Sequence, residues 1–314
     1  MGREIRDLAA GLPYELRLIA GDEEASGLLT VQGDEPALAA ALDRDALEGA
    51  RVVFLAGSPE SARKAAEFAE DAVLIDLTYG AEDRPGARLR APMVEPEDYD
   101  APEEAVQVIA HPAAIAIALV LGRIHAVHPV RRAVIHVFEP ASERGAPGVE
   151  ELQQQTVGLL SFKGQPKKVF DEQLSFNLLA RYGEEAPVPL EAAETRVERH
   201  LATLLSLADT AVPMPSVRLI QAPVFHGHSF SCWVEFEDNP GVAEVEAVLA
   251  AASIDVRDSG TAPPTPVGMA GQSGVAVGAV APDVNDPEAC WLWMASDNLR
   301  LAAENALLVA RQYL

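Results

Sequence analysis

Two histidines and a cysteine lie close together in the chain and are the side chains best suited to chemistry. His226 and His228 flank Gly227, and Cys232 follows four residues after His228. Because an imidazole titrates near neutral pH, His228 is a candidate to exchange protons with a thiol or a hemiacetal. The alternative is a structural histidine that is hydrogen-bonded at the start of a strand.

The same residues suggest two other kinds of site. His226 and His228 are expected on one face of an extended segment, where they could bind a metal, but no third ligand is identifiable and we assign no metal site. Cys232 could be a nucleophile. Its alternation with Trp233 and Val234 instead favours a small, buried side chain on a strand.

The elements that position these residues follow an α/β pattern. Through about residue 125, short apolar runs alternate with helical patterns rich in Ala, Glu and Arg, which is typical of βαβ units and a parallel sheet. Residues 82–102, rich in proline and acids, are predicted to be a loop. A second sheet is expected to contain strands 134–138 and 231–236, with helices near 148–160, 191–208, 241–252 and about 297–313.

Composition limits the class of protein. The chain has 314 residues, 49% of them hydrophobic and 23% charged, which is long enough for two domains with separate cores. Its net charge of −24 at pH 7 disfavours binding to nucleic acid or to an anionic membrane. Two cysteines are too few for a disulfide framework, and we find no signal peptide or long apolar run. We therefore expect a cytoplasmic protein.

Several segments of the chain resemble the aspartate-semialdehyde dehydrogenase family, in the same order. The most specific are residues 148–156, 173–179, 222–229 and 296–300, and weaker resemblance to strands of the nucleotide domain covers 16–20, 53–58 and 73–76. The resemblance implies a Rossmann-like nucleotide domain that lacks its first strand, an α+β dimerisation domain, and a C-terminal helix that returns to the first domain. These correspond to residues 1–123, 124–296 and 297–314.

The resemblance places an alanine where the family carries its nucleophile. Residues 108–118 correspond to the family segment that ends in a Pro-Asn-Cys turn, whose thiol attacks the aldehyde. The thiol position falls on Ala114. Because a methyl group forms neither a thiohemiacetal nor an acyl-enzyme, the resemblance implies the fold without its covalent chemistry.

Other family positions are also changed. The glutamine that orients the acyl intermediate falls on Glu139, and a substrate-binding arginine falls near Glu82. The arginine that pairs with the substrate carboxylate falls on Gln221, which supplies neither a charge nor a bidentate fork.

Some family positions keep their side chains. His228 matches the acid–base histidine, and Glu194 matches a glutamate that contacts the substrate, so both are catalytic candidates. The alternative for Glu194 is a solvated helix face. Asn298 resembles a residue near the nicotinamide, although it could equally begin a helix.

NAD or NADP is the cofactor that the resemblance implies, with Gly57 and Asn298 as candidate contacts. A dinucleotide domain opens with a strand and a Gly-rich turn that holds the pyrophosphate. Residues from Met1 onward resemble those just after that turn, so either cofactor binding is lost or the start codon is assigned too far downstream. The acidic residues 22–24 would repel the 2′-phosphate of NADP; a solvated acidic turn is the alternative.

The sequence thus predicts an aspartate-semialdehyde dehydrogenase-like homodimer without the thiol-dependent reaction, with a binding or regulatory role and a small-molecule ligand. Two alternatives stay open. One is an enzyme with altered chemistry built around His228. The other is an NAD(P)-dependent oxidoreductase of the same family in amino-acid biosynthesis.

We expect the gene to begin upstream of the Met1 codon. The family's first strand is central in its sheet, and its loss would remove two rows of ladder hydrogen bonds. Each of these hydrogen bonds contributes on the order of 1 kcal/mol. Genomic sequence directly 5′ of that codon should encode, in frame, an apolar run followed by a Gly-rich turn. An in-frame stop codon at this place would contradict the expectation.

Overall fold

Two compact units make up the described chain. The computed structural model describes residues 1–10, 12–21, 29–32, 35–69, 72–100, 106–208 and 211–314. One unit comprises Met1–Ala110 and Ala302–Leu314, and the other comprises His111–Leu301. Both contain helices and strands, so the predicted α/β class is confirmed. No described helix is long and apolar enough to cross a membrane.

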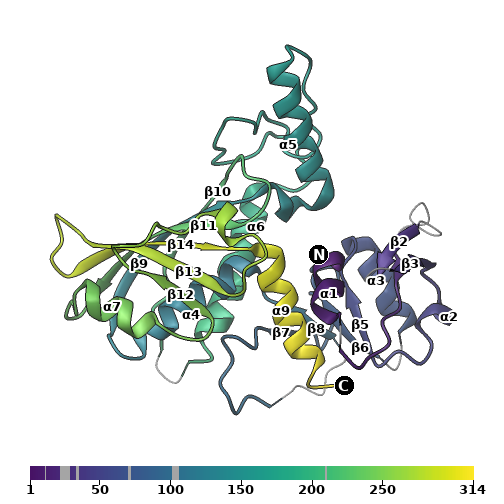
Figure 1. Ribbon diagram of the computed structural model, residues 1–314, viewed down its shortest axis with the longest axis horizontal. Helices are drawn as coiled ribbons and strands as arrows, with labels where there is room; N and C mark the ends of the chain where they lie inside the picture. The colour runs from purple at the N-terminus through teal and green to yellow at the C-terminus, as the bar shows by residue number, and fades with distance from the viewer. Residues whose placement is uncertain (11, 22–28, 33–34, 70–71, 101–105, 209–210) are drawn as a thin grey trace. The chain divides into compact units, whose positions relative to one another are not determined.

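The first unit contains a parallel sheet of four strands in the order β5-β6-β8-β7 (Figure 1). Two shorter pairings accompany it: β1 pairs with β4 in parallel, and β2 pairs with β3 antiparallel. The elements are α1 (Gly2–Ala9), β1 (Ile19–Ala20), β2 (Leu29–Gln32), β3 (Glu35–Leu38), β4 (Ala40–Ala41), α2 (Arg44–Leu47), β5 (Val52–Leu55), α3 (Pro59–Phe68), β6 (Val73–Asp76), β7 (Arg88–Arg90) and β8 (Val106–Ile109).

The expected strands of this unit are present, but one loop prediction is wrong. Of residues 16–20, only β1 is a strand. Residues 82–102 contain β7, which pairs with β8. The sequence does not predict this strand because Arg90 is charged and yet completely buried. Its guanidinium donates to Glu95 at 2.9 and 3.0 Å and to Gln107 at 3.0 Å. The acidic residues 22–24 lie outside the described residues.

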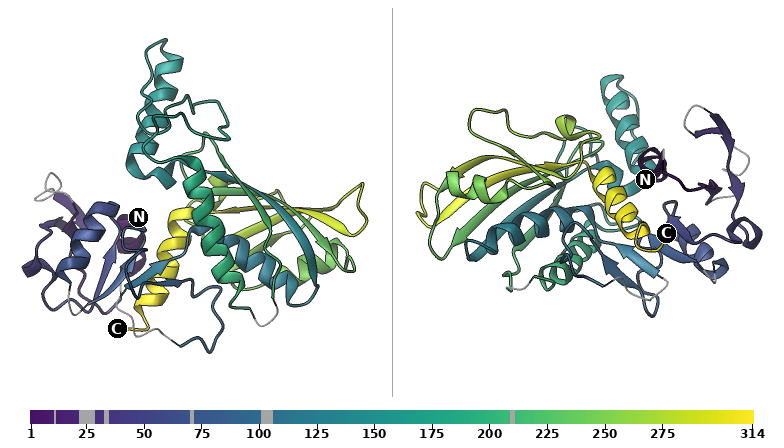
Figure 2. Two further views of the ribbon diagram at one scale, coloured as in Figure 1. Left: turned by 180° about the vertical axis from the view of Figure 1, so that it is seen from behind. Right: turned by 60° about the horizontal axis from the view of Figure 1, so that its bottom comes forward.

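The second unit contains a mixed sheet of six strands in the order β10-β9-β11-β14-β13-β12. Figures 1 and 2 show helices α4, α6 and α7 together on one face of this sheet. The elements are α4 (Pro112–His125), β9 (Val130–Glu139), η2 (Ala141–Arg144), α5 (Gly145–Leu160), α6 (Leu190–Leu205), β10 (Ser216–Gln221), β11 (His228–Phe236), α7 (Val242–Leu249), β12 (Ile254–Arg257), α8 (Pro266–Met269), β13 (Val275–Pro282), β14 (Ala289–Ser296) and α9 (Asn298–Ala310), which continues into the first unit.

Helix α4 is the central helix of the second unit. Ala and Ile residues surround its axis, and nearly all of them are buried, from Ala113 to Ile124. A helix that is apolar on every side must be covered on every side, and α4 packs on α6, α7 and β9. The amino end of α4, where His111 and Ala114 lie, is therefore fixed by the core.

Helix α5 and residues 161–175, which follow it, form an arm (Figure 1). Two buried side chains of α5 hold the arm together. Glu151 accepts hydrogen bonds from the backbone N–H groups of Lys168 and Val169 at 2.6 and 2.8 Å. Gln155 accepts from the backbone of Leu174 and Ser175 at 2.7 and 3.0 Å. Its amide also donates to two backbone carbonyls of the same loop, each at 2.9 Å.

We predict that Gln155→Ala destabilises the arm, because it leaves buried backbone groups without partners. The free energy of unfolding should fall by about 1–3 kcal/mol in urea denaturation. Gln154→Ala is the matched control, because Gln154 is exposed and its side chain donates to Glu150 on the same helix. Equal stability of the two variants would contradict the assigned role of Gln155.

Candidate functional site

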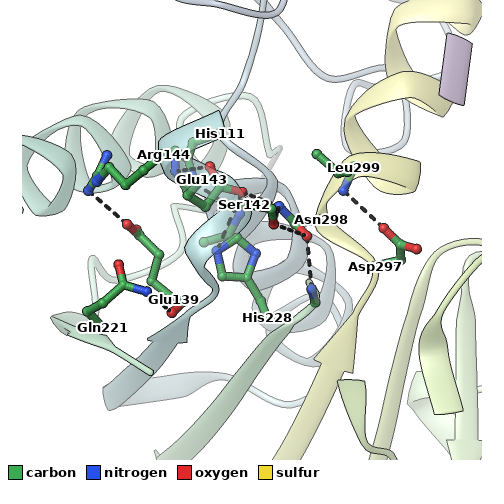
Figure 3. Close-up of polar contacts among 12 residues, drawn as sticks. His111, Glu139, Ser142, Glu143, Arg144, Gln221, His228, Asp297, Asn298 and Leu299 are labelled. Atoms are coloured by element: carbon green, nitrogen blue, oxygen red, sulfur yellow. Dashed lines mark hydrogen bonds and ion pairs between the residues drawn. The ribbon is translucent and has the colours of Figure 1, made fainter. Parts of the chain in front are cut away.

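Four segments of the second unit bring polar side chains together around the carboxylate of Glu143 (Figure 3). Glu143 lies in η2, and its oxygens face His111, His228 and Asn298. Burial opposes ionisation of Glu143, but the two imidazoles and the Asn298 amide favour the carboxylate, and the resulting pKa is well below its usual range. The site therefore holds a fixed negative charge at neutral pH.

His228, a sequence candidate, lies at the start of β11 and is completely buried. Its Nε2 is 3.8 Å from Glu143 Oε1, and neither ring nitrogen has a hydrogen-bond partner among the described residues. Burial lowers the pKa of His228 to about 4, although Glu143 opposes the shift. His228 is thus neutral at pH 7, with one ring nitrogen able to accept a proton.

His111 connects this cluster to the first turn of α4. Its Nε2 is 3.3 Å from Glu143 Oε2, and its ring centroid is 5.7 Å from that of His228. As the N-cap residue of α4, His111 accepts at Nδ1 the backbone N–H of Ala113 at 3.2 Å. Ala114, onto which the resemblance places the family nucleophile, is the next residue and is completely buried. The methyl group of Ala114 therefore lies in the buried first turn of α4, which His111 caps.

Asn298 is both a helix start and a site residue. Helix α9 begins at Asn298, and the side chain of Asp297 caps it by accepting the N–H groups of Leu299 and Arg300, each at 3.0 Å. Because Asp297 caps the helix, the Asn298 side chain can contact the cluster around Glu143. It donates to Glu143 Oε1 at 2.7 Å and accepts the N–H of Gly227 at 2.9 Å.

A second buried network contains Glu139 and Gln221, which the resemblance places at substrate positions of the family. Arg144 pairs with Glu139 at 2.8 Å and donates to the Tyr182 hydroxyl at 3.0 Å. That hydroxyl donates to Gln221 Oε1 at 2.5 Å, and the Gln221 amide donates to the Glu139 carbonyl at 2.8 Å. Burial raises the pKa of Glu139, against the opposing charge of Arg144, and one of its carboxylate oxygens has no hydrogen-bond partner within the described part of the chain.

The other candidates from the sequence lie apart from the Glu143 cluster. The expectation that His226 and His228 share a face is wrong: Gly227 has φ +87°, which ends the extended conformation, so that His226 is exposed and His228 buried. Glu194, on α6, accepts the backbone N–H of Leu219 at 2.7 Å and pairs with Arg218 at 3.2 Å, which attaches the helix to β10. No group of three or more described residues could hold a metal ion.

Both cysteines of the chain are buried in the second unit. Cys232 is 2% exposed, which confirms the predicted small buried side chain, and its Sγ contacts the sulfur of Met294 at 3.4 Å. Burial raises the pKa of Cys290 to about 12 and raises that of Cys232 as well. Neither sulfur is a thiolate at neutral pH.

Gly57 does not form an open cradle for a dinucleotide. A Cβ on Gly57 would stand 2.7 Å from Ser61 Oγ, and one on Gly21 would stand 2.8 Å from the same atom. Ser61 in turn exchanges hydrogen bonds with Ser58 at the start of α3. The side chain of Ser61 therefore leaves too little room for a Cβ at either position, which explains why both residues are glycine. The described residues around them do not fit a pyrophosphate, and we derive no step through a nicotinamide.

The sequence did not single out His111, Glu143 or Arg144. His111 stands in the segment that contains Ala114, and its place before Pro112 was the available signal for an N-cap. Glu143 and Arg144 carry no local signal. Apart from the Arg144–Glu139 pair, their partners come from segments far apart in the chain, so their burial depends on tertiary packing.

Comparison with known proteins gives a consistent result. Residues 121–301 match the family model described as semialdehyde dehydrogenase, dimerisation domain. The chain is 33% identical over 265 residues to a USG-1 protein homolog of Pseudomonas aeruginosa, covering 82% of this chain and 77% of that protein. It is 26% identical over 325 residues to an aspartate-semialdehyde dehydrogenase of Synechocystis, covering 99% and 93%. A solved structure of a probable aspartate-semialdehyde dehydrogenase from Pseudomonas aeruginosa aligns with TM-score 0.84 and 29% identity, covering 99% of this chain and 94% of that one.

We predict that His228 gives the folded protein a pH dependence at mildly acid pH. Between its ordinary pKa of 6.5 and about 4, the unfolded chain binds a proton at this residue and the folded chain does not. Folding stability therefore falls as pH falls through this interval, by at most on the order of 3 kcal/mol from this group. An NMR titration of the His228 ring should show a midpoint near 4.

Two variants separate this effect from other titrations. His228→Gln should flatten the decline in unfolding free energy between pH 6.5 and 4, whereas His226→Gln, the exposed neighbour, should leave the decline as it is. A His228 midpoint at or above 6.5 would show that the ring is not buried in its neutral form.

Proposed function

Because the chain belongs to the semialdehyde dehydrogenase family that includes the aspartate-semialdehyde dehydrogenases, we propose that it is a member without the thiol-dependent reaction, with a binding or regulatory role. The observation that carries this proposal is the environment of Ala114. This residue is buried at the helix start beside His111, and the only two cysteines of the chain are Cys232 and Cys290, both with raised pKa values. Covalent catalysis needs an accessible, ionised sulfur, which neither provides.

The changed substrate positions support the same proposal. The resemblance implies a charged arginine at position 221 to bind the substrate carboxylate, but Gln221 is neutral and bonded to Tyr182 and Glu139. The nearby guanidinium of Arg144 is already paired with Glu139. An incoming carboxylate would therefore have to compete with a buried internal carboxylate, which is unfavourable.

The retained groups support ligand binding. His228 is neutral, buried and without a hydrogen-bond partner among the described residues, and Glu143 holds a negative charge next to it. A buried polar group without a partner costs free energy, so a ligand that donates a hydrogen bond to the ring would be stabilised there. A small polar molecule is the class of ligand that suits these groups.

We predict no phosphorylating semialdehyde dehydrogenase activity. Steady-state assays with aspartate semialdehyde, phosphate and either NAD or NADP should stay at background, with an active family member as the positive control. Ala114→Cys alone should not restore full activity, because the missing bidentate contact at Gln221 would still cost roughly 2–5 kcal/mol. Turnover near ordinary enzyme rates by the unmodified chain would contradict the proposal and favour the NAD(P)-dependent oxidoreductase.

We further propose that the chain forms a homodimer through the sheet face opposite α4. On that face Trp233 lies opposite both Val134 and Trp291, and the latter two are 37% and 40% exposed. The arm adds exposed apolar side chains, including Leu160 at 71% and Phe162 at 99%. Exposed apolar groups of this extent are typical of an interface, and the match to a dimerisation domain supports a second copy as the partner.

Sedimentation should therefore show a dimer at micromolar concentration. Val134→Lys places a charge on the open sheet face and should weaken the dimer by about tenfold or more. Val127→Lys is the matched control, because Val127 is also exposed but lies two residues after the end of α4 and not on a strand of the open sheet face. A wild-type monomer, or equal dimerisation of both variants, would be evidence against this interface.

A further inference from the structure

Four polar side chains form a row across four neighbouring strands of the second sheet, at the end next to η2. Ser296 on β14 pairs with His228 on β11, and Gln221 on β10 pairs with Glu139 on β9. The antiparallel register of β9 and β11, continued by one residue, places His228 beside Glu139 (Figure 3). All four residues are completely buried. Because directly opposite residues of neighbouring strands share a face, the four side chains lie on one face of the sheet.

Gln221 is the member of this row whose side chain has partners. It accepts from the Tyr182 hydroxyl at 2.5 Å and donates to the Glu139 carbonyl at 2.8 Å. The other three members carry atoms that have no hydrogen-bond partner among the described residues: Glu139 Oε2, both ring nitrogens of His228, and Ser296 Oγ. Buried polar groups in native proteins are nearly always paired, so three unpaired neighbours in one row indicate a shared binding site.

The unpaired atoms of the row act mainly as hydrogen-bond acceptors. The carboxylate oxygen of Glu139 can only accept. The neutral ring of His228 has one acceptor nitrogen, and Glu143, 3.8 Å from Nε2, favours the proton on that nitrogen and leaves Nδ1 as the acceptor. The hydroxyl of Ser296 accepts as well as donates. A ligand that satisfies the row must therefore bring hydrogen-bond donors.

Only one oxygen of the Glu139 carboxylate is paired with a positive charge. Arg144 contacts Oε1 at 2.8 Å and also donates to the Tyr182 hydroxyl at 3.0 Å. Burial raises the pKa of Glu139, and a positive group at Oε2 would favour its ionised form. A ligand carboxylate would instead place a like charge beside Glu139 and Glu143, which is unfavourable. The donor group that suits this row is therefore positively charged.

The row lies close to exposed segments of the second unit, although its own members are buried. In η2, which begins two residues after Glu139, Glu143 and Arg144 are half-buried. His226, two residues before His228, is exposed. A ligand that reaches the row from these segments must be small, because the side chains that it contacts are completely buried.

We propose that Glu139, His228 and Ser296 form a recognition site for a small primary amine in its ammonium form. The assignment rests on the proposed function, because it names the class of ligand that the same site binds. The three N–H donors of an ammonium group match the three acceptors. Neighbouring strands lie about 4.8 Å apart, so adjacent members of the row are within reach of one small molecule.

The test compares two probes of equal size and opposite charge on the full chain. Propylammonium chloride and sodium propionate are titrated separately into the millimolar range at constant ionic strength, because ligands of so few atoms bind weakly. The ring resonances of His228 are followed by NMR. Propylammonium should shift them saturably, and propionate should not. The ring of His226, exposed two residues away, is the internal reference for non-specific attraction to a chain of net charge −24.

Three variants assign the effect to the row. Glu139→Gln should weaken propylammonium binding by about tenfold or more, because it removes a charged acceptor. Glu150→Gln, an exposed position on α5, is the matched control and should leave binding unchanged. Ser296→Ala should weaken binding by about fivefold. It should leave the melting temperature of the free protein unchanged or raised, because the hydroxyl that it removes has no partner among the described residues.

The Ser296→Ala result decides the matter if Glu139→Gln fails to fold. Saturable binding of propionate at His228, no saturable shift with either probe, or equal propylammonium affinity of the wild type and the Ser296→Ala variant would overturn the proposal. None of these outcomes bears on the absence of the thiol-dependent reaction, which is tested separately by turnover of aspartate semialdehyde.

Discussion

The largely buried carboxylate of Glu143 is the constraint on which the second unit depends. Transfer of a charge into the protein interior costs several kcal/mol unless partners are present. Here the partners are His111 before α4, His228 at the start of β11 and Asn298 at the start of α9. Each segment must therefore be in place before the charge is stabilised, and the charge in turn holds their polar ends together around one point.

Under the proposed function, this arrangement accounts for a stable fold with alanine at position 114. The position of the helix start is fixed by the core around α4, by the N-cap contact of His111 and by the bond from its backbone to His200 at 2.9 Å. None of these contacts needs a sulfur at position 114, so alanine there costs no stabilising interaction. Glu139 pairs with Arg144 through one carboxylate oxygen, and Gln221 accepts a hydrogen bond from Tyr182, so both have partners in the same chain. We infer that the stability of this site depends on side chains other than the one that carries the thiol in the family.

The sequence predicted strands β5, β6, β9 and β11 and helices α5, α6, α7 and α9, because the period of apolar residues reports which faces are buried. It did not predict β10, β12, β13 and β14, the other four strands of the second sheet. It failed where local chemistry and tertiary environment disagree. Strand β7 ends at Arg90, whose charge is paired with the Glu95 carboxylate only after folding. Gly227 places His226 and His228 on different sides through its positive φ, which alternation alone does not reveal. In the site, His228 and Asn298 were found by resemblance, whereas Glu143 could not be, since its partners come together only in the folded chain.

Intact-protein mass spectrometry tests the central claim most directly. The protein is incubated with aspartate semialdehyde and NADP without phosphate, quenched in acid and compared with an active family member, in which an acyl-enzyme accumulates when no phosphate is present to release it. The account predicts an unmodified mass, because Ala114 offers no sulfur and Cys232 and Cys290 are buried thiols. An acyl adduct that peptide mapping places on either cysteine would contradict it.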